Sequence, residues 1–162
     1  MKKYKWAIVL INLILFLAYC NYSIAKKEVL IKEGTLVLLR LAPVDPRSLM
    51  QGDYMALNYE IATNHEVDSI PKNGYCVVKL DANQVAHLVR FQAHKQPLAA
   101  KEHLIKYAHS NPWSLNIGAE SYFFQEGEAE KYELAEFGAL RIDKEGNSVL
   151  VGLYNTQLQQ LK

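Results

Sequence analysis

The sequence predicts a mainly β protein: a single antiparallel β domain with one short helix, preceded by an N-terminal transmembrane helix. Three observations support this fold class. Residues 6–25 contain no Asp, Glu, Lys or Arg, which is typical of a membrane span. The rest of the chain is divided by turn-forming residues into short apolar or alternating segments, as in antiparallel sheets. Residues 126–137 are the exception, because they are rich in Glu and Ala, which favour a helix.

The apolar N-terminal segment has the length and the ends of a membrane span. A helix of twenty residues covers about 30 Å, the thickness of the hydrocarbon core of a bilayer. Trp6 lies at one end, and Tyr19 and Tyr22 lie at the other, where aromatic side chains favour the membrane interface. We therefore predict a membrane anchor over residues 1–25, in contact with lipid through residues 6–25, and a β domain over residues 26–162.

Cleavage and orientation of this segment stay open at the sequence level. A lysine-rich start, an apolar core and Ser23-Ile24-Ala25 also fit a cleaved signal peptide. The lysines at positions 2, 3 and 5 favour a cytoplasmic N-terminus, but further lysines at positions 26, 27 and 32 flank the other end. We favour an uncleaved single span in the cytoplasmic (inner) membrane, with the domain facing the periplasm or the cell exterior.

The elements of the domain follow in a simple order. Residues 26–34 are charged and form either a helical turn or a short strand. Strands are expected at residues 36–41, 54–62, 75–80, 85–93, 103–108, 139–143 and 148–154, with one or two extended pieces between 113 and 124 interrupted at Gly118. Residues 81–84 and 144–147 are the turns of two hairpins, and residues 126–137 are the helix.

The densest group of turn formers, charges and aromatics lies at residues 52–59, Gly-Asp-Tyr-Met-Ala-Leu-Asn-Tyr. Gly52 tolerates a positive φ and Asp53 can hydrogen-bond its own backbone, so this pair predicts a turn. The odd-numbered residues from 55 to 61 then share one face of a strand, because side chains alternate. The segment therefore predicts a loop that brings Asp53 and Tyr54 to the start of a strand.

Composition argues against several classes of function. The net charge is +1, and it falls to about −2 without the three lysines at the N-terminus, so no basic surface predicts nucleic-acid binding. Cys20 lies in the apolar segment and Cys76 in a predicted strand, so neither a disulfide nor a zinc site is expected. The five histidines lack metal-ligand spacing. We expect no cofactor, no metal and no nucleic-acid partner.

The segment at 52–59 closely resembles the motif of a bacterial family of membrane-anchored proteins, the GDYXXLXY family, named for Gly-Asp-Tyr-x-x-Leu-x-Tyr. Every defining position is matched, by Gly52, Asp53, Tyr54, Leu57 and Tyr59. The lead-in at residues 43–49 and a second block at residues 118–129 are also similar to the family's. The resemblance implies an N-terminal span, an extracytoplasmic domain and no assigned activity. Members are often encoded beside a multi-span membrane protein, which suggests such a partner.

A polar cluster is the candidate binding site for a partner or a small ligand. Its members come from the lead-in, the motif and the second block: Asp45, Arg47, Asp53, Tyr54, Glu120 and Tyr122. A structural role is favoured for them, because Asp45 and Asp53 can cap turns and Arg47 can pair with either carboxylate. No residue is assigned a catalytic role.

Three functions are therefore considered. We favour a non-enzymatic accessory or interaction protein of the bacterial envelope, beside a multi-span membrane protein. The second is a hydrolase loosely similar to type I signal peptidases, with Lys79 as its base. Val44 occupies that family's nucleophile position and Ser48 is the nearest hydroxyl, and Lys79 would have to be buried. The third is small-ligand binding, which predicts a pocket joining the motif and the second block.

Overall fold

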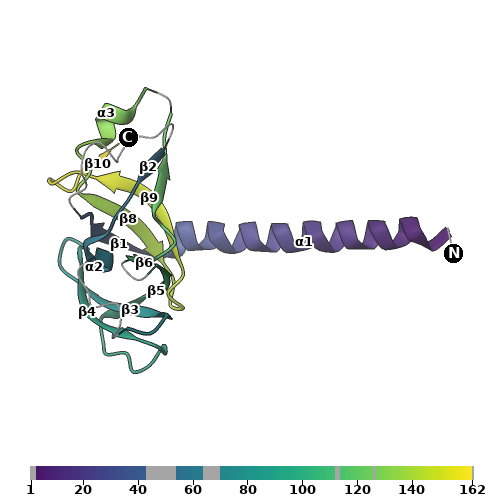
Figure 1. The fold of residues 1–162 in the computed structure, drawn as a ribbon, viewed down its shortest axis with the longest axis horizontal. Helices are drawn as coiled ribbons and strands as arrows, with labels where there is room; N and C mark the ends of the chain where they lie inside the picture. Colours follow the sequence, from purple (N-terminus) through teal and green to yellow (C-terminus); the bar gives the residue numbers. More distant parts are fainter. Residues whose placement is uncertain (1–2, 43–53, 64–69, 112–113, 126, 162) are drawn as a thin grey trace.

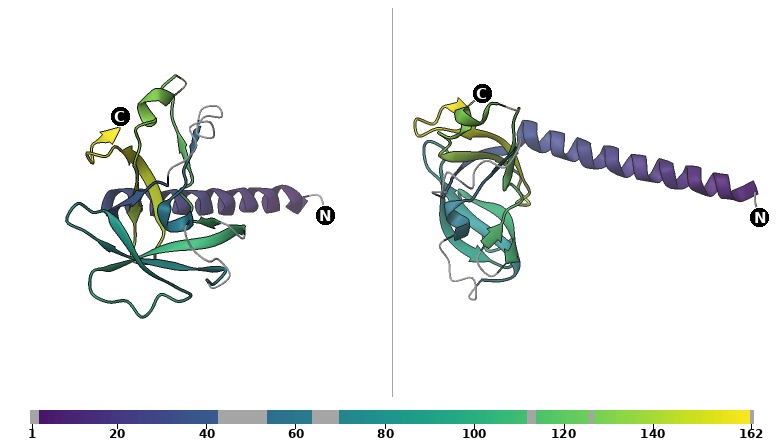
Figure 2. Two further views of the ribbon diagram at one scale, coloured as in Figure 1. Left: turned by 60° about the vertical axis from the view of Figure 1, so that its left-hand side comes forward. Right: turned by 45° about the horizontal axis from the view of Figure 1, so that its top comes forward.

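The computed structural model describes residues 3–42, 54–63, 70–111, 114–125 and 127–161. A long helix, α1 (Lys3–Glu33), projects from a β domain whose long dimension lies across the helix axis (Figure 1), and two further views show the same projection (Figure 2). The domain carries two short helices, α2 (Glu60–Thr63) and α3 (Ala129–Tyr132). The predicted fold class, a mainly antiparallel β domain behind an apolar N-terminal helix, is confirmed.

The described strands form two four-stranded sheets and a two-stranded ribbon, and every pairing between strands is antiparallel. The first sheet has the order β1 (Thr35–Arg40), β8 (Phe137–Ile142), β9 (Ser148–Tyr154) and β10 (Gln160–Leu161). The second has the order β4 (Ala86–Gln92), β3 (Asn73–Leu80), β5 (Glu102–Asn111) and β6 (Ser114–Asn116). The ribbon pairs β2 (Tyr54–Ala56) with β7 (Ser121–Phe123).

One hydrophobic core joins the two sheets and the ribbon. It takes Val37 and Leu39 from β1, Cys76 from β3 and Ile105 from β5, all fully buried. Leu38 points to the other side of β1, into a smaller cluster. The sequence predicted a strand buried on both faces here, and the three consecutive buried residues confirm it. Burial also raises the pKa of the Cys76 thiol to about 12, as expected for a core cysteine.

The end of α1 is built into the domain. Leu30 is its one buried residue among those described. Gly34 then ends the helix, since its N–H donates to the Leu30 carbonyl at 2.9 Å and its own carbonyl accepts from Arg141 at 2.7 Å. A Cβ at Gly34 would lie 2.4 Å from the Leu30 oxygen, so the junction requires glycine. Residues 26–33 thus continue the helix, and the short strand considered for them is wrong.

Both predicted hairpins are confirmed, between β3 and β4 and between β8 and β9. Their turns share one mechanism. The Asp81 carboxylate accepts the N–H groups two and four residues later at 2.8 and 2.9 Å, and Asp143 does the same at 3.0 and 2.8 Å. Asn155 repeats the pattern before β10, a strand that the sequence did not predict. Such side-chain bonds stabilise turns directly.

Two predicted elements are wrong in extent. The strand expected at 54–62 ends at Ala56, and α2 begins at Glu60. The alternation in the sequence reports burial, which continues through Tyr59 after the strand pairing stops. The helix expected at 126–137 is present only over the four residues of α3. Its Glu and Ala propensity is outweighed by Phe137, which is buried as the first residue of β8.

Candidate functional site

The motif and the second block lie side by side although more than sixty positions separate them. In the β2–β7 ribbon, Tyr54 is opposite Phe123 and Met55 is opposite Tyr122. Beyond the ribbon, the Leu57 N–H donates to the Glu120 carbonyl at 2.8 Å. The structure therefore brings together five of the predicted site residues, namely Tyr54, Leu57, Tyr59, Glu120 and Tyr122.

Tyr59 contacts two other parts of the domain, at Ala119 and at Gly138 of β8. Its ring is 1% exposed, and its hydroxyl donates to the Ala119 carbonyl at 2.7 Å. The same ring lies against Gly138 of β8, where an added Cβ would be 2.8 Å from the ring carbon Cε1. Burial, followed by the nearby negative charge of Glu120, raises the pKa of the Tyr59 hydroxyl. The group stays neutral and acts as a structural hydrogen-bond donor.

The carboxylate of Glu120 accepts hydrogen bonds from the turn in which Glu120 itself lies. One carboxylate oxygen accepts the backbone N–H groups of Ile117 and Gly118, the latter at 3.0 Å. Gly118 has a φ of +80°, a conformation that glycine adopts without strain. Because both bonds go to backbone donors within three residues, the geometry assigns Glu120 the stabilisation of this turn.

Tyr122 is half-buried in an aromatic cluster with Phe124 and Tyr132. The ring centroids of Tyr122 and Tyr132 lie 5.1 Å apart, and those of Phe124 and Tyr132 lie 5.2 Å apart. Burial raises the pKa of the Tyr122 hydroxyl to about 12. Edge-to-face packing of this kind stabilises a fold, so Tyr122 and Leu57, which is 2% exposed, both belong to the packing of the domain.

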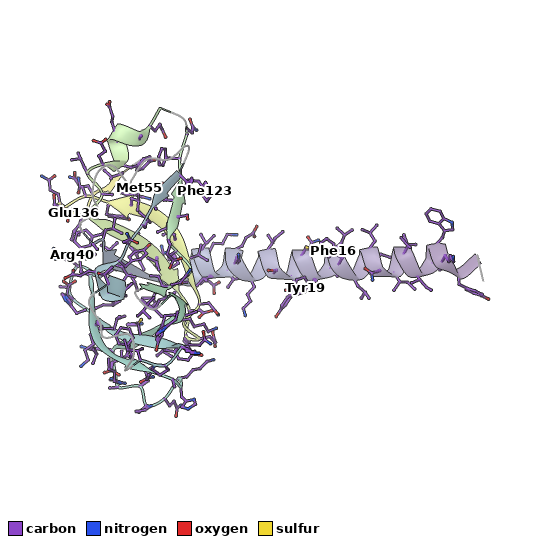
Figure 3. All side chains as sticks on the ribbon, in the orientation of Figure 1. Phe16, Tyr19, Arg40, Met55, Phe123 and Glu136 are labelled. Atoms are coloured by element: carbon purple, nitrogen blue, oxygen red, sulfur yellow. The ribbon has the colours of Figure 1, made fainter. Side chains whose placement is uncertain are left out.

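Tyr54 differs from Leu57 and Tyr59, the other defining residues of the motif that the structure describes, because its side chain reaches the surface. It is 39% exposed and packs against Phe123, which is 75% exposed, with ring centroids 5.9 Å apart. We call these two residues the aromatic patch. Phe123 lies on the side of the domain from which α1 leaves, whereas Arg40 and Glu136 lie on the far side (Figure 3).

Several predicted residues lie outside the described part of the chain: Asp45, Arg47, Gly52 and Asp53, as well as Ser48 of the hydrolase hypothesis. Lys79 is described and is exposed on β3, so the burial that the hydrolase hypothesis requires is missing. Within the described residues, no three His, Cys, Asp or Glu side chains are grouped so that they could hold a metal ion.

A charged cluster on β4 and β5 was not predicted. Arg90 on β4 donates to both carboxylate oxygens of Glu102 on β5 at 2.9 Å each. The Ala99 N–H also donates to Glu102, and Arg90 donates to the Pro97 carbonyl at 2.8 Å. These bonds hold the pKa of Glu102 at about 2. The cluster fixes the β4–β5 loop, and no motif in the sequence marks it.

Comparison with known proteins agrees with the motif. The family described as GDYXXLXY protein matches residues 16–153, which include most of α1 and nearly all of the domain. No curated protein and no solved structure gives a significant match.

Proposed function

Because the chain belongs to the GDYXXLXY family, we propose that it is a single-pass, non-enzymatic accessory protein of the bacterial envelope that binds a neighbouring multi-span membrane protein. In this proposal α1 anchors the chain in the cytoplasmic membrane, and the domain faces the periplasm or the cell exterior. The anchor is supported by its composition: residues Tyr4–Glu33 form one helix long and apolar enough to span a membrane, and none of its most apolar window is buried.

The aromatic patch is the observation that carries the proposal. Leu57, Tyr59, Glu120 and Tyr122 are all engaged within the domain, whereas the ring of Tyr54, alone among the described candidate site residues, is exposed to a partner. Exposed aromatic side chains are enriched in protein interfaces. A partner in the same membrane can reach the patch, because Phe123 lies on the side of the domain from which α1 leaves (Figure 3).

The two alternative functions have less support. The exposure of Lys79 weighs against a hydrolase of the signal-peptidase type, because an amine base needs burial to lose its proton. The small-ligand hypothesis is supported by the contact between the motif and the second block, which it requires. However, the Tyr59 hydroxyl and the Glu120 carboxylate, which a ligand would use, already bind backbone groups.

Co-purification in mild detergent tests the partner. The full-length chain should recover a multi-span membrane protein, and Phe123→Ser should reduce that recovery at least fivefold. Val89→Ser is the matched control, because Val89 is also an exposed strand residue (42%) but lies on β4. Recovery that is unchanged by Phe123→Ser, or reduced equally by Val89→Ser, would contradict the proposed interface.

Labelling of a single engineered cysteine tests the orientation. Asn83→Cys, made in a Cys20→Ser background, places a thiol in the exposed β3–β4 turn, and the remaining native cysteine, Cys76, is buried. A maleimide that cannot cross the cytoplasmic membrane should label this variant in intact spheroplasts. Labelling that appears only after the spheroplasts are lysed would place the domain in the cytoplasm.

A further inference from the structure

A groove runs along the last turns of α1, where the helix meets the domain. Ser23, Lys26, Lys27 and Leu30 form its helix side, and Lys106 and Asn147 lie on the domain side. Its volume is about 340 Å³. We call it the basic groove.

The charge of the basic groove is positive. Three lysines line it, against one carboxylate, that of Asp143. Asp143 is turned toward its own turn, where it accepts the backbone N–H groups of Glu145 and Asn147 and the side-chain amide of Asn147 at 2.6 Å. Within the described residues, neither Lys26 nor Lys27 has a carboxylate within ion-pair distance. An anion entering the groove would therefore meet unneutralised ammonium groups.

The groove lies at the depth of lipid headgroups. Lys26 and Lys27 directly follow the uncharged residues 6–25, and each helical residue rises 1.5 Å. The headgroup layer on each side of the hydrocarbon is roughly 5–7 Å thick, which corresponds to about one helical turn. With residues 6–25 in the hydrocarbon, both ammonium groups reach the layer that contains the phosphates.

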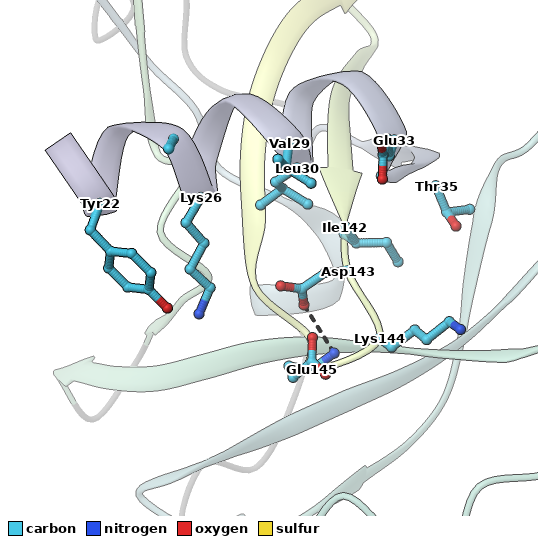
Figure 4. A pocket seen from close by; sticks show the side chains of 12 residues that line it. Tyr22, Lys26, Val29, Leu30, Glu33, Thr35, Ile142, Asp143, Lys144 and Glu145 are labelled. Carbon is cyan, nitrogen blue, oxygen red and sulfur yellow. Dashed lines mark hydrogen bonds between the residues drawn. The ribbon is translucent and has the colours of Figure 1, made fainter.

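A second groove adjoins the basic one at the end of α1, and both apolar and charged side chains line it, the charged ones being Lys26, Glu33, Asp143, Lys144 and Glu145. Its volume is about 600 Å³, and it shares Lys26, Leu30 and Asp143 with the basic groove. Val29, Leu30 and Ile142 form part of its wall, with Tyr22 at its membrane end (Figure 4). This apolar wall lies further from residues 6–25 than Lys26 does, because Val29 and Leu30 follow Lys26 along α1 and Ile142 is opposite Thr35. The second groove therefore does not lead from Lys26 toward the hydrocarbon, and the lipid site is confined to the basic groove.

We propose that the basic groove binds the phosphate of an anionic phospholipid. The proposal rests on the membrane insertion of α1 and goes beyond the proposed partner, because it assigns a lipid to the junction itself. Bound there, one lipid contacts α1, β5 and the β8–β9 turn together, and so stabilises the domain against the membrane.

Binding of soluble short-chain lipids to the full-length protein in neutral detergent tests the site. Dihexanoyl phosphatidylglycerol is compared with dihexanoyl phosphatidylcholine and with inorganic phosphate, using the ligand-induced rise in melting temperature and calorimetric affinity. The test variant carries Lys26→Gln, Lys27→Gln and Lys106→Gln. The matched control carries Lys72→Gln, Lys79→Gln and Lys95→Gln, which change the net charge equally at exposed positions away from the groove.

Phosphatidylglycerol should bind the wild type and the control variant equally, and it should bind the test variant roughly a hundredfold more weakly, at about fivefold per lysine. Phosphatidylcholine and inorganic phosphate should bind the wild type at least tenfold more weakly. Equal phosphatidylglycerol binding by the test variant, or inorganic phosphate binding as tight as the lipid, would overturn the proposal. Loss of the wild type from carbonate-washed membranes would instead contradict the anchoring itself, so the two failures are distinguishable.

Discussion

Replacing Gly138 by Ala tests whether the motif tyrosine depends on a glycine in β8. An ideal Cβ at this position would lie 2.8 Å from Cε1 of Tyr59, 2.9 Å from its hydroxyl and 3.3 Å from Cζ. Carbon atoms in proteins pack at about 3.5–4.0 Å, so either the ring or the strand must move. The ring has little freedom, because it is buried and its hydroxyl is bonded to Ala119.

The expected cost follows from three contributions. Overpacking a dense core costs about 1–3 kcal/mol. Displacing the ring also weakens the Tyr59–Ala119 hydrogen bond, which contributes about 1 kcal/mol. Alanine restricts the unfolded chain, which offsets about 0.4–1 kcal/mol. Gly138→Ala should therefore lower the free energy of unfolding by about 1–3 kcal/mol.

A double-mutant cycle with Tyr59→Leu isolates the contact. Urea unfolding of the full-length chain in detergent is measured for the wild type, both single variants and the double variant. With the ring removed, Gly138→Ala should cost less than about 0.5 kcal/mol, because coupled neighbours are not additive. An equal cost of Gly138→Ala in both backgrounds, or no cost in the wild type, would refute the packing argument.

Three further predictions address other parts of the domain. The pKa of Glu102 is held at about 2 by Arg90, below its ordinary value of about 4.3, so its stabilising effect is complete above about pH 5 and is lost as the pH falls toward 2. Glu102→Gln should flatten the dependence of melting temperature on pH in that range, and an unchanged slope would contradict this origin. Glu120→Ala leaves the Ile117 N–H without its acceptor, whereas the Gly118 N–H keeps Asn116 Oδ1 at 2.8 Å. This variant should lower the free energy of unfolding in urea by about 1 kcal/mol, and Glu120→Gln, which keeps the acceptor, should cost less. In the hairpin turns, Gln84 has a φ of 65° and Gly146 a φ of 83°; Gln84→Asn should raise the melting temperature slightly and Gly146→Ala should lower it, because Asn and Gly tolerate this conformation better than Gln and Ala do.

Side-chain alternation predicted burial in the motif better than it predicted hydrogen bonding. Met55, Leu57 and Tyr59 are all buried, as their shared face required, whereas Ile61 is buried as a residue of helix α2. The strand nevertheless stops at Ala56. Alternation depends on which side chains face the core, and an extended chain that leaves its partner strand keeps that pattern. The end of the ladder depends on β7, which is equally short.

The candidate site could be predicted in outline only. The sequence singled out two blocks, and the structure pairs them. The sequence did not indicate that the Glu120 carboxylate accepts hydrogen bonds from its own turn, because that contact depends on the local path of the chain at Gly118. The Arg90–Glu102 cluster could not be predicted from the sequence for another reason. β4 and β5 both pair with β3, so this contact depends on two strand registers at once.

The junction between α1 and β1 contains a single residue, Gly34, held from both sides by Leu30 and Arg141. A domain joined in this way has no flexible tether on which to rotate. In the membrane-anchored state that we propose, any tilt or axial rotation of the helix is passed to the sheets as a rigid-body movement. Under that proposal, the lipid around the helix would set the direction in which the aromatic patch points.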